Sequence, residues 1–269
     1  SGKASAHGSP LGEDEIALVR KKLKWIYKPF EIPKEILNEW KKIGEKGILE
    51  EKKWNSIYNK KSKKIQEEIT RITNNKLPKN FDSHIAQLKK NIYNLKANTA
   101  TRQSSAFVLE NITKTLPELL GGSADLSGSN NTKTKYSTII KSSNFNGNYI
   151  HYGVREHGMA GIMNGMALHG GIIPYGGTFL IFLDYCKPSL RLSAMMGLKV
   201  IYVFSHDSIG LGEDGPTHQP IEHLAHLRAI PNLNVFRPAD TIETLECWEI
   251  ALKSSSNPSV IALSRQKLP

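Results

Sequence analysis

Residues 200–204 read Val-Ile-Tyr-Val-Phe, five apolar residues in a row, and the chain turns polar immediately afterwards with Ser205 and His206. A strand with one face in water alternates apolar and polar residues, whereas a strand covered on both faces is continuously apolar. The run therefore predicts a central strand of a parallel sheet that carries helices on both faces.

Similar short runs lie on either side of this strand, and helical patterns separate them. The candidate strands are residues 149–152, 172–175, 233–236 and 259–263. Helices are expected to begin near Glu156, Phe179, Ile221 and Thr241. Strands that alternate with helices are typical of α/β folds. From residue 99 onward we expect an α/β domain with a three-layer parallel sheet.

The first 98 residues have polar helical patterns instead. A helix is expected from Pro10, with acids in its first turn and bases in its last. Further helices are expected near residues 34–46, 51–73 and 82–96, separated by Gly44, Gly47 and residues 76–80. We therefore divide the chain into a helical linker, residues 1–98, and the α/β domain, residues 99–269.

The composition is that of an ordinary globular protein, with 39% hydrophobic and 23% charged residues. No stretch approaches the roughly 20 apolar residues of a membrane span. Most of the net charge of +11 lies in residues 1–100, where 22 Lys and Arg face 12 Asp and Glu in mixed helical patterns. Cys186 and Cys247 have no CxxC partner. We expect a cytoplasmic protein that binds neither nucleic acid nor membrane.

In parallel α/β sheets, ligands bind beyond the carboxyl ends of the strands. This rule places five segments on one rim: residues 121–130, 153–158, 176–185, 205–218 and 264–265. Seven of the nine histidines fall between His151 and His226. Of these, His218, His223 and His226 have spacings that a zinc site could use, but no cluster of Asp, Glu or Cys completes a ligand shell.

Other candidate groups on the rim also have structural explanations. Glu156 lies at a strand-to-helix junction, where the helix dipole favours an acid. Phe179, Phe182 and Tyr185 recur at a helical spacing, which suits a buried face about as well as a ring-stacking site. Their position after a strand favours a ligand site over core packing.

The segment His206–Pro220 is harder to explain by packing. It reads HDSIGLGEDGPTHQP and combines titratable side chains with three glycines and two prolines. This density of glycine and proline indicates a loop, and polar groups on a loop at the rim point to a binding or catalytic function.

The rim segments resemble the pyrimidine-binding domain of transketolases. Five motifs occur in the family's order and nearly at its spacing: GGSADLSGSN (121–130), YGVREHGM (152–159), TFLIFLDY (178–185), HDSIGLGEDGPTHQP (206–220) and LSRQKLP (263–269). The opening HGSPLG (7–12) is similar to the last active-site segment of the family's diphosphate-binding domain. The resemblance covers the whole chain and is loosest over residues 40–98.

The resemblance implies an enzyme of the pentose phosphate pathway that uses thiamine diphosphate to transfer a two-carbon ketol unit from a ketose phosphate to an aldose phosphate. By the match, Glu156 hydrogen-bonds a ring nitrogen of the aminopyrimidine and helps the cofactor to lose its C2 proton. Phe179, Phe182 and Tyr185 would form the slot for the pyrimidine, with Asp125 close to the cofactor.

The match also implies residues that bind a phosphorylated sugar. The family's phosphate-binding positions are occupied by Arg102, Ser129, His206 and Arg265. Asp214 matches the residue that reads a substrate hydroxyl, and His218 and His7 match histidines that contact the reacting carbonyl or hydroxyl. The expected catalytic residues are Glu156, His218, His206 and His7.

One part of the family's site has no counterpart in the sequence. Transketolases hold the diphosphate and its Mg²⁺ or Ca²⁺ with a GDG motif followed by Asn residues, and this chain contains no GDG. We expect a fragment without metal ligands of its own that is inactive alone. The resemblance also implies a homodimer whose site lies between subunits.

Other interpretations remain, three within thiamine diphosphate enzymes and one outside catalysis. Deoxyxylulose phosphate synthases and 2-oxo acid dehydrogenase β-subunits share the glutamate and the fold, and dihydroxyacetone synthase is closer still. The His206-Asp207-Ser208 sequence, together with Arg102, Ser129 and Arg265, favours transketolase. A non-catalytic subunit or interaction domain would keep the fold and lose the catalytic residues. The retention of these residues argues against that interpretation.

Overall fold

The computed structural model describes residues 3–93 and 98–268. The chain divides into two compact units, Ser1–Gln66 and Glu67–Pro269. The division falls inside a helix, and the domain boundary at residues 98 and 99 stays a prediction. The last residues of the helix expected over 82–96 lie outside the described part of the chain.

The first unit consists of helices that bury no side chain within residues 13–22 and 34–59. They are η1 (Ala4–Ala6), α1 (Glu13–Lys22) and α2 (Lys34–Asn59). The expected break at Gly44 and Gly47 is wrong, because α2 runs through both. A glycine costs a helix only about 1 kcal/mol relative to alanine, and the break lies after Asn59 instead.

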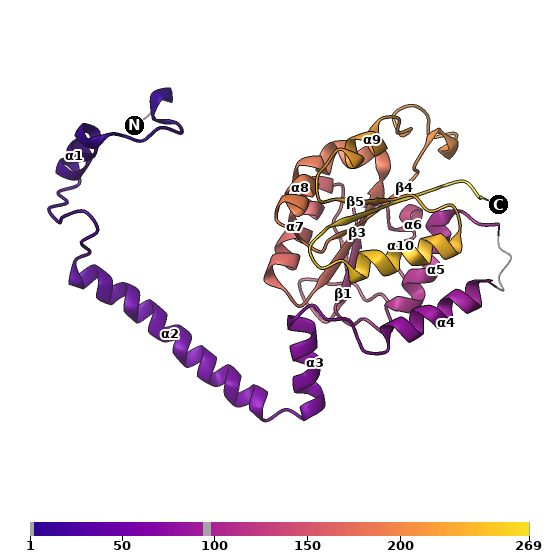
Figure 1. The fold of residues 1–269 in the computed structure, drawn as a ribbon, viewed down its shortest axis with the longest axis horizontal. Coiled ribbons are helices and arrows are strands. Elements are labelled where there is room, and N and C mark those ends of the chain that lie inside the picture. The colour runs from indigo at the N-terminus through magenta and orange to yellow at the C-terminus, as the bar shows by residue number, and fades with distance from the viewer. Residues whose placement is uncertain (1–2, 94–97, 269) are drawn as a thin grey trace. The chain divides into compact units, whose positions relative to one another are not determined.

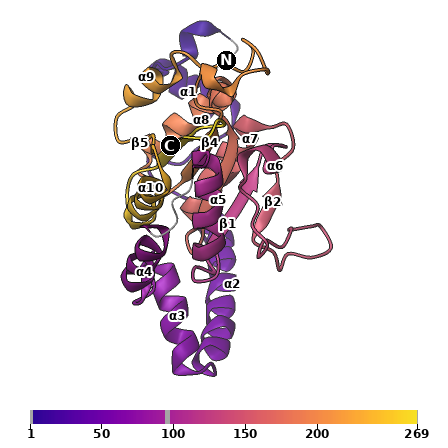
Figure 2. The same ribbon diagram turned by 90° about the vertical axis from the view of Figure 1, so that its right-hand side faces the viewer.

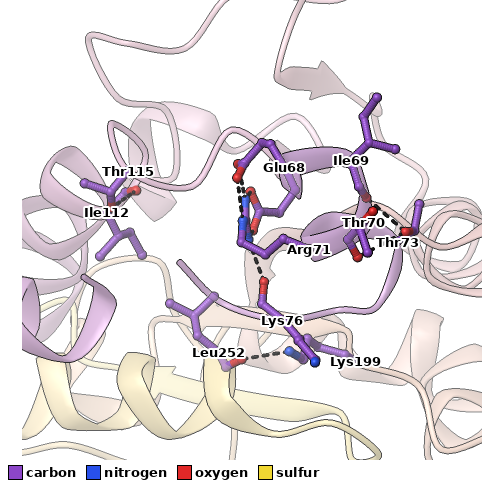
Figure 3. Close-up of polar contacts among 11 residues, drawn as sticks. Glu68, Ile69, Thr70, Arg71, Thr73, Lys76, Ile112, Thr115, Lys199 and Leu252 are labelled. Atoms are coloured by element: carbon purple, nitrogen blue, oxygen red, sulfur yellow. Dashed lines mark hydrogen bonds and ion pairs between the residues drawn. The ribbon is translucent and has the colours of Figure 1, made fainter. Parts of the chain in front are cut away.

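Two helices precede the sheet, α3 (Lys63–Thr73) and α4 (Phe81–Tyr93). Arg71 of α3 donates to both carboxylate oxygens of Glu118, at 2.7 and 3.0 Å, and to the carbonyl oxygen of Lys76. Figure 3 shows Arg71 between Glu68 and Lys76. Because Glu118 directly precedes the first strand, this ion pair lies at the amino end of the sheet, away from the predicted rim.

The second unit contains one parallel sheet of six strands in the order β2-β1-β3-β4-β6-β5. The strands are β1 (Leu119–Ser123), β2 (Tyr149–His151), β3 (Ile173–Phe179), β4 (Ile201–Ser205), β5 (Asn234–Phe236) and β6 (Ser259–Leu263). All five strand pairs are parallel. The expected parallel α/β sheet is therefore confirmed.

Helices cover both faces of this sheet and complete three layers (Figure 1). They are α5 (Thr101–Ile112), the short α6 (Ser127–Asn130), α7 (Glu156–His169), α8 (Leu183–Met195), α9 (His223–Arg228) and α10 (Thr241–Lys253). Strand β4 shows why its sequence is continuously apolar. Ile201 and Val203 pack with α4, α5 and α10, whereas Tyr202 and Phe204 pack with α7 and α8.

Two features of the sheet differ from the expectation. Strand β1 was not predicted, and β3 continues four residues beyond Tyr175, through Gly176 and Gly177. Glycine is unfavourable in isolated strands, but these glycines leave room for neighbours. A Cβ on Gly176 would lie 2.6 Å from Sδ of Met163 and 2.9 Å from Sδ of Met159, so the missing side chain lets α7 approach the sheet.

The loop between α6 and β2 projects beyond the sheet (Figure 2). Among the described residues, none of the helices is long and apolar enough to cross a membrane.

Candidate active site

The predicted rim exists, because four neighbouring strands end beside one another at the same edge of the sheet. Asp125 follows β1, Glu156 follows β2, Phe182 follows β3 and His206 follows β4 directly. The carboxyl ends of parallel strands point the same way. The sequence therefore brings residues from distant segments to one edge.

An open cavity of about 500 Å³ lies at this edge. Its lining residues are Ala124, Asp125, Leu126, Val154, Glu156, Phe182, Tyr185 and His218. Glu156 is the first residue of α7 and is only 7% exposed. Burial raises the pKa of the nearby Cys186 thiol to about 12, and the negative charge of Glu156 adds to this shift. One wall thus carries a buried acid and another carries aromatic rings.

The spacing of the three aromatic side chains suggested one helix, but the structure places them on three different elements. Phe179 ends β3, Phe182 belongs to a 3₁₀ turn and Tyr185 lies in α8. The rings nevertheless form a row. The centroids of Phe179 and Phe182 are 5.8 Å apart, and those of Phe182 and Tyr185 are 5.9 Å apart. His218 packs edge-to-face on Phe182 at 5.4 Å.

His206 sits behind this row in a buried position, 3% exposed. The ring stacks on Phe179 with centroids 3.7 Å apart, and Nδ1 lies 2.9 Å from Oγ of Ser205. Burial, and secondarily the positive charges of Arg102 and Arg265, lower the pKa of His206 to about 4, although Asp214 opposes the shift. At neutral pH the imidazole is therefore uncharged.

Two guanidinium groups lie close together near His206. Arg102 donates through Nη1 to the carbonyl oxygen of Ser129 at 2.8 Å, and Arg265 forms an ion pair with Glu213. Burial and the charge of Arg265 lower the pKa of Arg102, whereas Asp214 raises it. The Nε of Arg102 is buried without a hydrogen-bond partner in the described part of the chain. Like charges held together in this way favour an anion between them.

One predicted site residue belongs to the other unit. His7 is an exposed residue that follows η1 in the first unit, and its role in the site stays a prediction. The remaining predicted residues share the rim: Arg102, Asp125, Ser129, Glu156, Phe179, Phe182, Tyr185, His206, Asp214, His218 and Arg265. Their roles stay predictions as well.

The histidines considered for a metal site are arranged differently. The ring centroids of His223 and His226 are 6.5 Å apart, and His223 is buried with Nε2 3.1 Å from Oδ1 of Asp184, without the alignment of a hydrogen bond. Within residues 3–93 and 98–268, no group of three His, Cys, Asp or Glu side chains is arranged to hold a metal ion.

Several residues that support the rim were not predicted from the sequence. Arg237 donates through Nε to Oδ2 of Asp207 at 2.8 Å, and Asp207 is only 7% exposed. Arg237 follows β5 at the same edge of the sheet, so its position after a strand could have identified it. Asn130 and Ser205 are fully buried polar residues behind His206. Both belong to predicted rim segments, but nothing in the sequence indicates that their side chains hydrogen-bond to each other.

Comparisons with known proteins agree with this geometry. The profile of the transketolase pyrimidine-binding domain matches residues 97–269, and that of the transketolase thiamine diphosphate-binding domain matches residues 1–78. A transketolase from Sinorhizobium medicae is 53% identical over 273 residues, which cover all of this chain and 38% of that protein.

Solved structures give the same result. A Pichia stipitis transketolase in complex with sedoheptulose 7-phosphate has a TM-score of 0.87 at 39% identity, over 98% of this chain and 40% of that one. A split-gene transketolase, described as an inactive β4 tetramer, has a TM-score of 0.52 at 28% identity, over 64% of this chain and 52% of that one.

The chain thus spans about 40% of the length of the relatives to which it is most similar here. The pyrimidine-binding profile alone covers more than half of it. From its strand order, its rim residues and these matches, the chain belongs to the transketolase family.

Proposed function

We propose that this chain carries the aminopyrimidine and sugar-phosphate side of a transketolase active site. The reaction is the reversible transfer of a two-carbon ketol unit between a ketose phosphate and an aldose phosphate. The observation that carries the proposal is the cavity in which the buried Glu156 faces an aromatic wall of Phe182 and Tyr185.

The cavity fits the aminopyrimidine of thiamine diphosphate. A flat heteroaromatic ring requires an apolar or aromatic wall and a few polar groups that set its orientation. Phe182 and Tyr185 supply the wall, and Glu156 supplies a carboxyl group that can hydrogen-bond a ring nitrogen. When bound, the cofactor supplies the carbanion chemistry that no amino-acid side chain offers. The protein would orient the ring through the aromatic wall and place the Glu156 carboxyl group against a ring nitrogen.

The pair of arginines on the rim, Arg102 and Arg265, supports a phosphorylated substrate. Arg265 lies close enough to Arg102 to help lower its pKa, after burial, and an anion between the two groups would relieve their repulsion. Planar guanidinium groups match phosphate oxygens in pairs. Asp214 is exposed beside them and can accept a hydrogen bond from a sugar hydroxyl. His218 lines the cavity and can exchange a proton with the reacting oxygen.

The remaining parts of the proposal follow from family membership. Residues 1–98 would be the tail of the diphosphate-binding domain and the linker, and residues 99–269 the pyrimidine-binding domain. Mg²⁺ or Ca²⁺ and the diphosphate would be held by residues outside this chain, since it contains no GDG motif. The enzyme would act in the cytoplasm, in the pentose phosphate pathway.

A homodimer is supported by an exposed apolar surface on the second unit. Helices α7 and α8 expose Ile162, Leu168, Leu192 and Met195 to between 47% and 64%. Exposed apolar side chains gathered on neighbouring helices are typical of a protein interface. We propose that this surface pairs with a second copy, as a site between subunits requires.

A second candidate function is a subunit that is inactive alone. The similar split-gene structure described as an inactive β4 tetramer supports it. In that case this chain would bind the pyrimidine side of the cofactor, and a separate polypeptide would bind the diphosphate.

Complementation tests whether the chain supplies part of an active site at all. Turnover of a ketose phosphate and aldose phosphate pair would be measured with the purified chain, thiamine diphosphate and Mg²⁺, with and without an added diphosphate-binding domain from a relative. We expect no turnover from the chain alone and turnover after complementation. A Glu156→Gln chain serves as the negative control. No turnover in any combination, with both partners folded, would contradict the proposed activity and favour an interaction domain.

A further inference from the structure

The hydrogen bonds behind His206 determine which of its ring nitrogens carries the proton. They begin at Asn130, which is fully buried. Its amide nitrogen donates to the carbonyl oxygen of Thr178 at 3.0 Å and to Oγ of Ser205 at 2.7 Å. A carbonyl oxygen can only accept, so the amide nitrogen must face Thr178. The amide oxygen lies 2.9 Å from the hydroxyl of Ser123, which can donate to it.

The orientation of the Asn130 amide determines the direction of the hydrogen bond between Ser205 and His206. Its Oγ accepts from Asn130 and lies 2.9 Å from Nδ1 of His206. In the described part of the chain these are the two hydrogen-bond partners of this fully buried hydroxyl. The amide nitrogen of Asn130 cannot accept the hydroxyl hydrogen, so Nδ1 is the acceptor that remains. An unpaired buried hydroxyl is unfavourable, and Nδ1 therefore carries no proton.

We propose that Asn130 and Ser205 are positioning residues that hold His206 in the neutral tautomer with its proton on Nε2, so that His206 presents a fixed N–H donor to an anionic oxygen. In this role His206 donates a hydrogen bond and does not act as a base. Its use toward a sugar phosphate rests on the proposed function, whereas the tautomer rests on contacts within this chain.

The charges around the ring agree with a neutral donor. The titratable groups that act on His206 are Arg102, Asp214, Arg265 and His218. Burial and the two arginines disfavour a positive imidazole, and burial is the larger cause. The arginines then supply the positive charge for an anion, and His206 supplies direction. Stacking on Phe179 restricts rotation of the ring and so fixes the Nε2–H vector.

The test is nitrogen-15 NMR of the purified chain with labelled histidine rings near pH 7. Long-range proton–nitrogen spectra distinguish a protonated ring nitrogen from an unprotonated one, and His206→Asn identifies the signals of His206. We expect one tautomer, unprotonated at Nδ1 and protonated at Nε2. A proton on Nδ1, a proton on both nitrogens, or a mixture of tautomers would overturn the proposal.

Variants test the role of the serine. Ser205→Ala should convert the single tautomer into a mixture, because Nδ1 loses its donor. Ser193→Ala is the matched control, since Ser193 is also fully buried and bonded to an asparagine, Asn164. It should leave the His206 signals unchanged. A Ser205→Ala chain that keeps the original tautomer would overturn the positioning role.

A measurement on the unaltered chain covers the case in which Ser205→Ala does not fold. Scalar coupling between the Ser205 hydroxyl proton and Nδ1 of His206 would support the proposal. A resolved hydroxyl proton that shows no coupling to Nδ1 would overturn it. None of these measurements needs turnover. A failed complementation assay would therefore count against the proposed function and leave the tautomer result standing.

Discussion

The rings of Phe179 and His206 lie nearly face to face, with centroids 3.7 Å apart and planes inclined by 28°. This contact joins the aromatic row of the cavity to the polar loop that begins at His206. It also buries an imidazole whose backbone has a φ of 59°, a conformation that most side chains avoid. The contact therefore combines a strained backbone with a suppressed charge, and both have measurable effects.

The first prediction concerns acid stability. Burial, followed by the charge of Arg102, lowers the pKa of His206 to about 4, below the value of about 6.5 in an unfolded chain. Between these values the unfolded chain binds more protons, so the free energy of unfolding falls as the pH decreases from about 6.5 to 4. The loss from this group is at most about 3 kcal/mol. Urea unfolding at several pH values measures it.

Two variants make this measurement specific. His206→Asn removes the titrating group and tolerates the positive φ, so its stability should depend less on pH in this window. His169→Asn, at an exposed position, should behave like the unaltered chain. Identical pH dependence in all three proteins would show that His206 is not the group responsible.

The second prediction concerns Glu156. In the complemented enzyme, Glu156→Gln should lower kcat by about 100-fold or more, because an amide cannot hold and release the proton that general acid–base catalysis requires. Folding should be little affected, as the change is isosteric. Steady-state kinetics with saturating cofactor measure the effect, and Glu246→Gln, on the exposed side of α10, is the control. A kcat within twofold of the unaltered enzyme would rule out the assigned role.

The third prediction concerns Arg265. Arg265→Ala should raise KM for a phosphorylated donor by about 10-fold to 100-fold, the equivalent of one charged hydrogen bond. The kcat should change much less, because the contact is remote from the reacting carbon. A donor without phosphate should show no change in KM. Arg228→Ala, at an exposed position on α9, is the control, and an unchanged KM for the phosphorylated donor would refute the assignment.

The fourth prediction concerns the amino end of the sheet. The side chains of Arg71 and Glu118 are only 13% and 4% exposed. Arg71→Ala should lower the free energy of unfolding by about 3 to 5 kcal/mol, because it leaves the Glu118 carboxylate buried without its partner. The double variant with Met at 71 and Leu at 118 should recover most of this loss. A loss below about 1 kcal/mol in the single variant would contradict this account.

The sequence predicts best where one physical rule acts alone. The apolar run of β4 indicates burial on both faces, and the structure places its residues alternately in two cores. The rule that ligands bind beyond the carboxyl ends of strands places Glu156 and His206, which follow predicted strands, at the same edge of the sheet. Strand β1 was missed because Gly121 and Gly122 have little strand propensity. They are required because the rings of Tyr175 and Tyr152 occupy the space that their Cβ atoms would fill.

The site was predicted less completely, for a related reason. Residues such as Phe182 and His218 occur in motifs that a family match identifies. Asn130, Ser205 and Arg237 act through other side chains, at sequence distances of up to 75 residues. A hydrogen bond between buried polar groups depends on the final packing and leaves no periodic pattern in the chain. Three-dimensional coordinates are needed to find such residues.

Because Gly176 has no side chain, helix α7 contacts strand β3 there through the sulfur atoms of two methionines. Sδ of Met163 and Sδ of Met159 occupy the space that a Cβ at this position would need. Oxidation of either thioether would add a polar oxygen to a contact with no room for it. Helix α7 would then have to move away from the sheet, and Glu156, as its first residue, would move with it. Oxidation of these buried methionines would therefore displace the acidic group that lines the cavity.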